Sequence, residues 1–113
     1  MTTPRLGITP VVEGQAQAEI PINAAFNILD FFTNCTIKNR TTATPPGSPT
    51  AGDCYLVAAS PTGAWSGMAG KLAAWDGGSW VFCTVQTGQI VYDVNAADLR
   101  FWNGTAWKTI TFT

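Results

Sequence analysis

A chain of 113 residues is long enough for one domain with a thin hydrophobic core. Charged residues make up only 12% of it, the net charge is −1, and Lys and Arg form no cluster, which argues against nucleic acid or a membrane surface as a partner. No run approaches the ~20 apolar residues that a membrane-spanning helix requires. We expect other subunits to cover part of this weakly charged surface, although a monomer coated with Thr, Ser and Asn would have a similar composition.

The first 20 residues predict an extended arm rather than a folded element. Proline and glycine interrupt them repeatedly, and single apolar residues lie in between. Such an arm lies along its own domain or along a neighbouring subunit, so its apolar residues are candidates for an attachment interface. They are Leu6, Ile8, Val11 and Val12. The arm has no long apolar run typical of a secretory leader, so we expect synthesis in the cytoplasm.

Residues 23–32 predict one short helix, with Asn23 as a suitable N-cap. Apolar residues recur here at helical spacing. They are Ile22, Phe26, Leu29 and Phe32. A helix this short is stable only when it is packed against something. Its apolar stripe fits either a hydrophobic core or an oligomer axis.

A proline-rich connector follows the helix and a weakly alternating segment, residues 35–42, which predicts a short strand. Proline pairs in residues 44–52 favour polyproline geometry and cannot donate to a β ladder. We therefore divide the chain into an arm with its helix over residues 1–43, a connector over 44–52 and a β domain over 53–113.

The β domain shows short β-type runs with turn residues at regular intervals. A glycine-rich loop over residues 60–70 separates the first run from the others. The predicted strands are 53–59, 71–75, 80–85, 89–94, 99–102 and 107–113. The fold class is therefore mainly β: a small antiparallel meander, barrel or sandwich, with one short N-terminal helix and an extended arm.

Two copies of one signature dominate this domain, 27 positions apart in the chain. In each copy two tryptophans flank a four-residue turn that opens with Asp-Gly or Asn-Gly, and these dipeptides favour tight hairpins. Opposed aromatic residues on one face of a strand pair stabilise the hairpin. The residues are Trp75, Asp76, Gly77 and Trp80 in the first copy, and Trp102, Asn103, Gly104 and Trp107 in the second. A strand and a connector precede each hairpin, which indicates an internal duplication.

Catalysis has little support in the sequence, and we expect neither enzymatic activity nor a cofactor. The chain contains no histidine, which excludes Ser-His-Asp and Cys-His arrangements. Cys35, Cys54 and Cys83 lack the spacing of a zinc site, so we expect no metal. Free buried thiols are the simplest interpretation of the cysteines, and a structural disulfide is the alternative. Asp76 and Asp53 occupy positions where short acids form turns.

Trp65, in the glycine-rich loop, has two interpretations. An exposed indole could stack on the apolar face of a sugar, which makes Trp65 a possible glycan contact. Alternatively, the indole closes one end of the sheet or fills a subunit interface.

Over essentially its whole length the sequence resembles a phage-associated domain family, domain of unknown function 2793, which occurs in tail-fibre and spike proteins of tailed phages and in gene transfer agents. An ordered set of short motifs carries this resemblance. They are Gly14-Gln15-Ala16-Gln17, Pro45-Pro46, Gly52-Asp53, Gly63-Ala64-Trp65-Ser66-Gly67 and the first tryptophan hairpin, residues 75–80.

The resemblance implies a structural virion protein, a fibre, spike or adaptor, that is assembled in the cytoplasm of a bacterial host. It also implies a homotrimer that contacts other virion proteins through its N-terminal region. The alternative function is a receptor-binding module that recognises a polysaccharide on the host surface.

Overall fold

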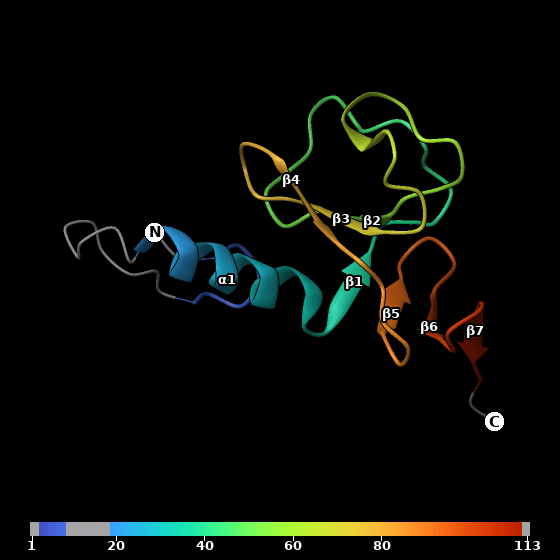
Figure 1. The fold of residues 1–113 in the computed structure, drawn as a ribbon. Coiled ribbons are helices and arrows are strands. Elements are labelled where there is room, and N and C mark those ends of the chain that lie inside the picture. Colours follow the sequence, from blue (N-terminus) through green and yellow to red (C-terminus); the bar gives the residue numbers. More distant parts are fainter. Residues whose placement is uncertain (1–2, 9–18, 112–113) are drawn as a thin grey trace.

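The computed structural model describes residues 3–8 and 19–111, and the side chains of its helix from residue 23 onward. It contains one α-helix, seven strands and a single 3-10 turn within these residues, so the predicted mainly β fold class is confirmed (Figure 1). The elements are α1 (Glu19–Phe32), β1 (Cys35–Ile37), β2 (Cys54–Leu56), η1 (Gly63–Trp65), β3 (Leu72–Trp75), β4 (Trp80–Cys83), β5 (Ile90–Asp93), β6 (Asp98–Trp102) and β7 (Trp107–Ile110).

The helix ends at Phe32 as predicted, but it begins at Glu19 and therefore includes Asn23. The prediction of Asn23 as N-cap is wrong. Pro21 lies in the first turn, where its missing N–H costs nothing because the first amides of a helix have no intrahelical acceptor. Proline is common in the first turn of a helix, so Pro21 could have indicated the earlier helix start.

The strands β2, β3 and β4 form an antiparallel sheet in chain order, which we call the first meander. Trp75 lies directly opposite Trp80 at the β3–β4 turn. The strands β5, β6 and β7 repeat this plan as the second meander, with Trp102 opposite Trp107. The predicted order of strand, connector and tryptophan hairpin is thus confirmed in both copies. Most observed strands are one to several residues shorter than the predicted ranges at one or both ends, whereas β6 begins one residue earlier than predicted, at Asp98.

Equivalent hydrogen bonds in the two meanders support an internal duplication. Gly52 and Gly88 occupy equivalent turns, with φ of 98° and 96°. The Gly52 amide donates to the Trp75 carbonyl at 2.8 Å, and the Gly88 amide donates to the Trp102 carbonyl at 2.7 Å. Both bonds fix the chain immediately before the first strand of the meander.

The segment after α1 connects the two meanders. β1 pairs with β5 in parallel, so the larger sheet has the order β1-β5-β6-β7 and is not purely antiparallel. Beyond β1 the chain continues alongside β2: the Lys38 amide donates to the Cys54 carbonyl at 2.8 Å, and the Leu56 amide donates to the Asn39 carbonyl at 3.2 Å. Of the predicted strand over residues 35–42, only residues 35–37 form a strand; the chain then bends and pairs with the other sheet.

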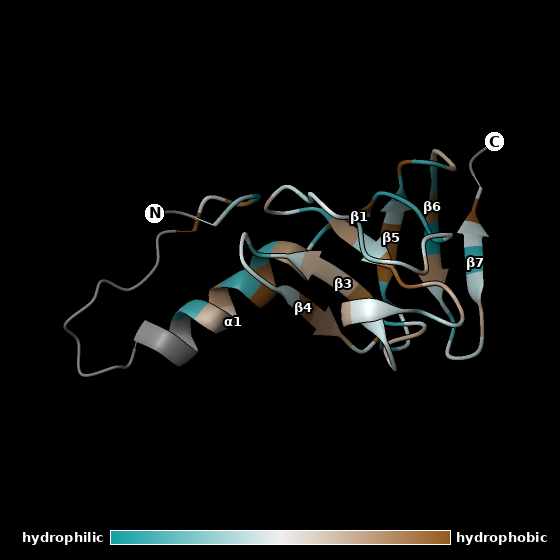
Figure 2. Cartoon of the chain, turned by 90° about the horizontal axis from the view of Figure 1, so that it is seen from above, coloured by the Kyte–Doolittle hydropathy of each residue, from teal (hydrophilic) through white to brown (hydrophobic). Residues whose placement is uncertain are grey.

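The main hydrophobic core lies between α1, β1 and the two sheets, and Phe31, Ile37 and Val91 are fully buried in it. Figure 2 shows the apolar C-terminal end of α1 beside β3 and β4, in agreement with the contact between α1 and β4. A second, smaller cluster lies on the opposite face of the first meander and surrounds Trp65. Residues from both sides of the 44–52 connector thus share one core.

Candidate functional site: a groove and two uncovered apolar faces

The two predicted tryptophan hairpins are confirmed in detail. The ring centroids of Trp75 and Trp80 are 5.2 Å apart with an interplanar angle of 61°, and those of Trp102 and Trp107 are 5.5 Å apart at 57°. Aromatic pairs at such distances contribute about 0.5–1.5 kcal/mol beyond the area that they bury.

The turns of the two hairpins are also alike. Asp76 Oδ1 accepts hydrogen bonds from the amides of Gly78 and Ser79, at 2.9 and 2.7 Å. In the second turn Asn103 Oδ1 accepts equivalent bonds from the amides two and three residues later, both at 2.8 Å. Gly77 and Gly104 follow with φ of 104° and 100°, a conformation that L side chains rarely adopt. Asp76 therefore acts as a turn former.

Trp65 is fully buried, so its predicted role as an exposed glycan platform is wrong. The indole packs on one face of the first meander rather than closing one end of the sheet. Its ring lies 5.5 Å from that of Tyr55 and 5.1 Å from that of Trp80. The loop between β2 and β3 folds back over the sheet and inserts the indole between these rings. The indole Nε1 is buried without a hydrogen-bond partner in the described structure.

A groove of about 600 Å³ lies where the two meanders meet. The half-buried tryptophan pair of the second hairpin, Trp102 and Trp107, lines one side. Leu56, Val57 and Val85 supply apolar surface, and Arg40 and Lys71 supply positive charge. Aromatic and cationic side chains together suit an extended ligand that carries negative charge.

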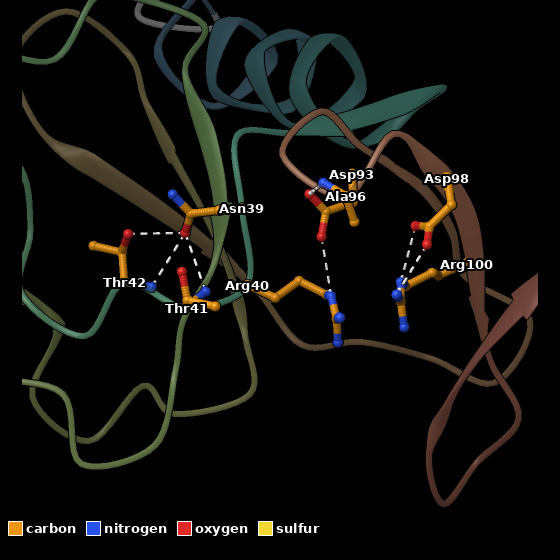
Figure 3. Close-up of polar contacts among 8 residues, drawn as sticks. All are labelled: Asn39, Arg40, Thr41, Thr42, Asp93, Ala96, Asp98 and Arg100. Carbon is orange, nitrogen blue, oxygen red and sulfur yellow. Dashed lines mark hydrogen bonds and ion pairs between the residues drawn. The ribbon is translucent and has the colours of Figure 1, made fainter.

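Arg40 is held in this groove by an ion pair. Its Nε donates to Asp93 Oδ2 at 3.0 Å, and the Asp93 side chain is only 2% exposed (Figure 3). Asp93 Oδ1 also accepts the Ala96 amide at 3.1 Å, which fixes the carboxylate. The terminal nitrogens of Arg40 lie on the side away from Asp93 (Figure 3). The arginine is thus oriented while part of its guanidinium faces away from its partner.

A polar turn at the base of Arg40 restrains the backbone there. Asn39 Oδ1 accepts hydrogen bonds from the amides of Thr41 and Thr42, both at 3.1 Å, and from the Thr42 hydroxyl at 2.8 Å (Figure 3). A second arginine, Arg100, is paired with Asp98 on its own strand at 2.9 Å. Sequence reasoning missed Arg40 because its partner Asp93 is 53 positions away in the chain.

The predicted apolar stripe of the helix is only partly buried in the single chain. Asp30 and Phe31 are fully buried, whereas Leu29 is 53% exposed and Ile28 is 46% exposed. Phe32 is partly buried against the main core, and Phe26 is of intermediate exposure. Ile28 and Leu29 share a side of α1 with the exposed Ala24 and Ala25, at helical spacing. We call these four residues the helix face. The side chain of the predicted stripe residue Ile22 lies outside the described structure.

The described part of the N-terminal arm is attached to the end of this helix. The buried Asp30 carboxylate accepts hydrogen bonds from the Thr3 hydroxyl at 2.7 Å and from the amides of Arg5 and Leu6. In return the Arg5 guanidinium donates to the last carbonyls of the helix, including Phe31 O at 2.9 Å. Leu6 is 48% exposed and Ile8 is of intermediate exposure. The predicted interface residues Val11 and Val12 lie outside the described residues.

The second meander exposes an apolar face that sequence reasoning did not single out. Ile90 is 53% exposed and Tyr92 is 39% exposed. The strand register places Phe101 opposite both Ile90 and the exposed Lys108. It places Leu99 opposite both Tyr92 and Ile110, so the five apolar side chains share one side of the sheet, beside Lys108. We call them the sheet face. The equivalent positions of the first meander, among them Cys54, Leu56, Leu72 and Ala74, belong to the main core beneath α1.

The described residues contain no group of three or more His, Cys, Asp or Glu side chains that could hold a metal ion. In the same part of the chain, no helix has the length and apolar character needed to cross a membrane.

Comparison with known proteins identifies the family but no characterised relative. A family model described as a protein of unknown function, DUF2793, matches residues 22–108. The matched range includes most of α1, the first meander, and the second meander up to the first half of β7. No curated protein matches the sequence.

Proposed function

We propose that this chain, which belongs to the DUF2793 family, has a structural role in a tailed phage or phage-like particle. In this proposal it is a self-associating fibre, spike or adaptor protein. The particle context comes from the resemblance of the sequence motifs. The observation that supports self-association is the sheet face of the second meander, which is apolar and uncovered in the single chain.

Comparison with the first meander, where the equivalent face is covered, supports this interpretation of the sheet face. There the equivalent face is covered by α1 and β1 together, with Phe31 and Ile37 fully buried in the same core. In the second meander Ile90 and Tyr92 remain exposed in the same register. Apolar sheet faces of this kind on isolated chains mark interaction sites, because burial stabilises by about 25 cal/mol per Å² of apolar surface.

The helix face is a suitable partner for the sheet face. It exposes Ile28 and Leu29 next to two alanines, and none of the four residues carries a charge. α1 and β7 lie at opposite ends of the molecule (Figure 1). We propose that the helix face of one copy packs on the sheet face of the next. Such a head-to-tail contact closes into a ring when the rotation permits, and a trimer is the smallest ring with more than two copies.

Attachment to other virion proteins is assigned in this proposal to the N-terminal region. Its described part is anchored on α1 through Asp30, which leaves Leu6 exposed. Deletion of the whole arm would leave the buried Asp30 carboxylate without its partners, so Leu6→Asp is the cleaner variant. We expect it to reduce incorporation into particles while the thermal unfolding of the protein is retained.

The self-association is tested by mass measurement of the native assembly. The wild-type chain is expected at a multiple of the 12.0 kDa monomer mass, with a trimer as the proposed state. Ile90→Asp places a charge in the centre of the sheet face and is expected to shift the assembly to monomer. Ala64→Asp, an equivalent substitution at an exposed loop position, is the matched control and leaves the assembly unchanged. A monomeric wild-type protein at tens of micromolar concentration contradicts the proposal.

The groove favours a second candidate function, recognition of a polysaccharide on the host surface. Trp102 and Trp107 offer aromatic surface beside Arg40 and Lys71, so the candidate ligand is an acidic glycan rather than a neutral one. Trp102→Ala is expected to weaken binding of an acidic polysaccharide at least tenfold. Trp75→Ala, in the equivalent position of the hairpin that does not line the groove, is the matched control. Absence of wild-type affinity for acidic polysaccharides removes this candidate.

A further inference from the structure

Two thiols from neighbouring elements meet inside the main core. The sulfur atoms of Cys35 on β1 and Cys54 on β2 lie 3.7 Å apart, and the residues are 3% and 1% exposed. The hydrogen bond from the Lys38 amide to the Cys54 carbonyl holds the two chain segments side by side. The sulfur atoms must approach by less than 2 Å to reach the bond length of a disulfide, about 2.05 Å.

The surroundings of the two sulfur atoms differ. A hydrogen bond with Cys54 lowers the pKa of the Cys35 thiol, with a further contribution from the positive charge of Arg5, although burial acts in the opposite direction. The same hydrogen bond and burial raise the pKa of Cys54 well above its usual range. Arg5 is fixed nearby because its guanidinium donates to Phe31 O at 2.9 Å and to Asn34 O at 2.8 Å. Cys35 is therefore the better nucleophile of the pair.

Two surface grooves adjoin the residues of the pair. Gly52, Asp53 and Cys54 line part of a groove of about 320 Å³. On another side Asn34 and Cys35 line part of a groove of about 540 Å³. A peroxide is small enough to reach such thiols through local motion, whereas a protein oxidant is not.

We propose that Cys35 and Cys54 form an intramolecular disulfide site that hydrogen peroxide closes. The Cys35 thiolate attacks one peroxide oxygen, the O–O bond breaks, and the departing hydroxide takes a proton to become water. The Cys54 sulfur then attacks the resulting sulfenic acid, the S–O bond breaks, and a second water leaves. Both sulfur atoms are oxidised, and one peroxide is reduced to two waters.

The bond would tie β1 to β2 and close a loop between residues that are 19 positions apart in the chain. This loop contains the proline-rich segment 44–52. Closure of a loop of this size restricts the unfolded chain, so the oxidised protein is expected to unfold at a higher temperature, by roughly 5–15 °C.

The third cysteine provides the internal control. The Cys83 thiol contacts the Thr84 carbonyl at 3.6 Å, and burial raises its pKa. It lies outside the hydrogen-bonded pair, so Cys83→Ser is expected to leave disulfide formation unchanged.

The experiment treats the reduced full-length Cys83→Ser protein with hydrogen peroxide and follows the intact mass, the tryptic peptides and the melting temperature. The expected product has lost two hydrogens, contains a Cys35–Cys54 peptide and melts at the higher temperature. In Cys54→Ser/Cys83→Ser the reaction is expected to stop at a Cys35 sulfenic acid, which dimedone traps. If the folded Cys83→Ser protein keeps both thiols, or gains oxygen without forming the disulfide, the proposal is overturned.

Discussion

The two meanders have the same backbone plan but different covers. In both, a glycine turn precedes the first strand and a tryptophan pair closes the hairpin. In the first meander the loop over residues 57–71 inserts Trp65 onto the tryptophan side, and α1 and β1 cover the other side. In the second, the connection over residues 94–97 is too short to cover anything, and the sheet face stays open.

The comparison distinguishes what sets the local geometry of a hairpin from what decides which side of its sheet is buried. The turn residues fix the local geometry of a hairpin wherever the motif occurs. Which side of the sheet is buried depends instead on the length of the preceding connection and on what the rest of the chain places there. The first meander is thus completed within its own chain, whereas we propose that the second is completed by another copy.

Trp65→Ala is expected to give the largest loss of stability, about 3–5 kcal/mol, because it empties the space between Tyr55 and Trp80. Trp102→Ala removes a half-exposed indole from the second hairpin and is expected to cost about 1–2 kcal/mol. Urea unfolding of both variants measures the difference. Equal losses in the free energy of unfolding would show that burial of Trp65 over the first meander adds no more stability than one half-exposed hairpin tryptophan.

The equivalent glycine turns allow a matched comparison of intermediate size. Alanine at Gly88 meets open space, so Gly88→Ala is expected to cost only the strain of its positive φ, about 1–3 kcal/mol. At Gly52 the new Cβ would lie 3.3 Å from Arg5 Cγ and 3.4 Å from Pro4 Cβ. Gly52→Ala should therefore cost more. A smaller loss for Gly52→Ala, again by urea unfolding, would contradict the contact between the arm and this turn.

The smallest effects are expected from exchanging the turn residues between the copies. Asp76 and Asn103 each use one side-chain oxygen to accept two amides, so Asp76→Asn and Asn103→Asp preserve the bonds and should each change stability by less than about 1 kcal/mol. Asp76→Ala and Asn103→Ala remove them and should cost about 1 kcal/mol each. Thermal unfolding of all four variants is the measurement, and unequal alanine losses would argue against equivalent turns.

Sequence reasoning succeeded where structure depends on neighbours in the chain. The hairpins follow from Asp-Gly and Asn-Gly between tryptophans, and the register of both followed from the motif alone. It failed where distant segments decide the outcome. The buried side of α1 depends on the position of the sheets, and the burial of Trp65 depends on the path of its loop. The ion pair between Arg40 and Asp93 joins segments on either side of the first meander, and no local signal predicts it.

The head-to-tail contact can be tested most directly by mixing two defective variants and measuring native mass. Ile90→Asp destroys the sheet face but leaves the helix face intact, and Leu29→Asp does the reverse. Each variant alone is expected to be monomeric, and an equimolar mixture is expected to form a heterodimer through the one intact pair of faces. A mixture that remains monomeric, while the wild-type protein assembles, would contradict the packing of α1 from one copy on the second meander of the next.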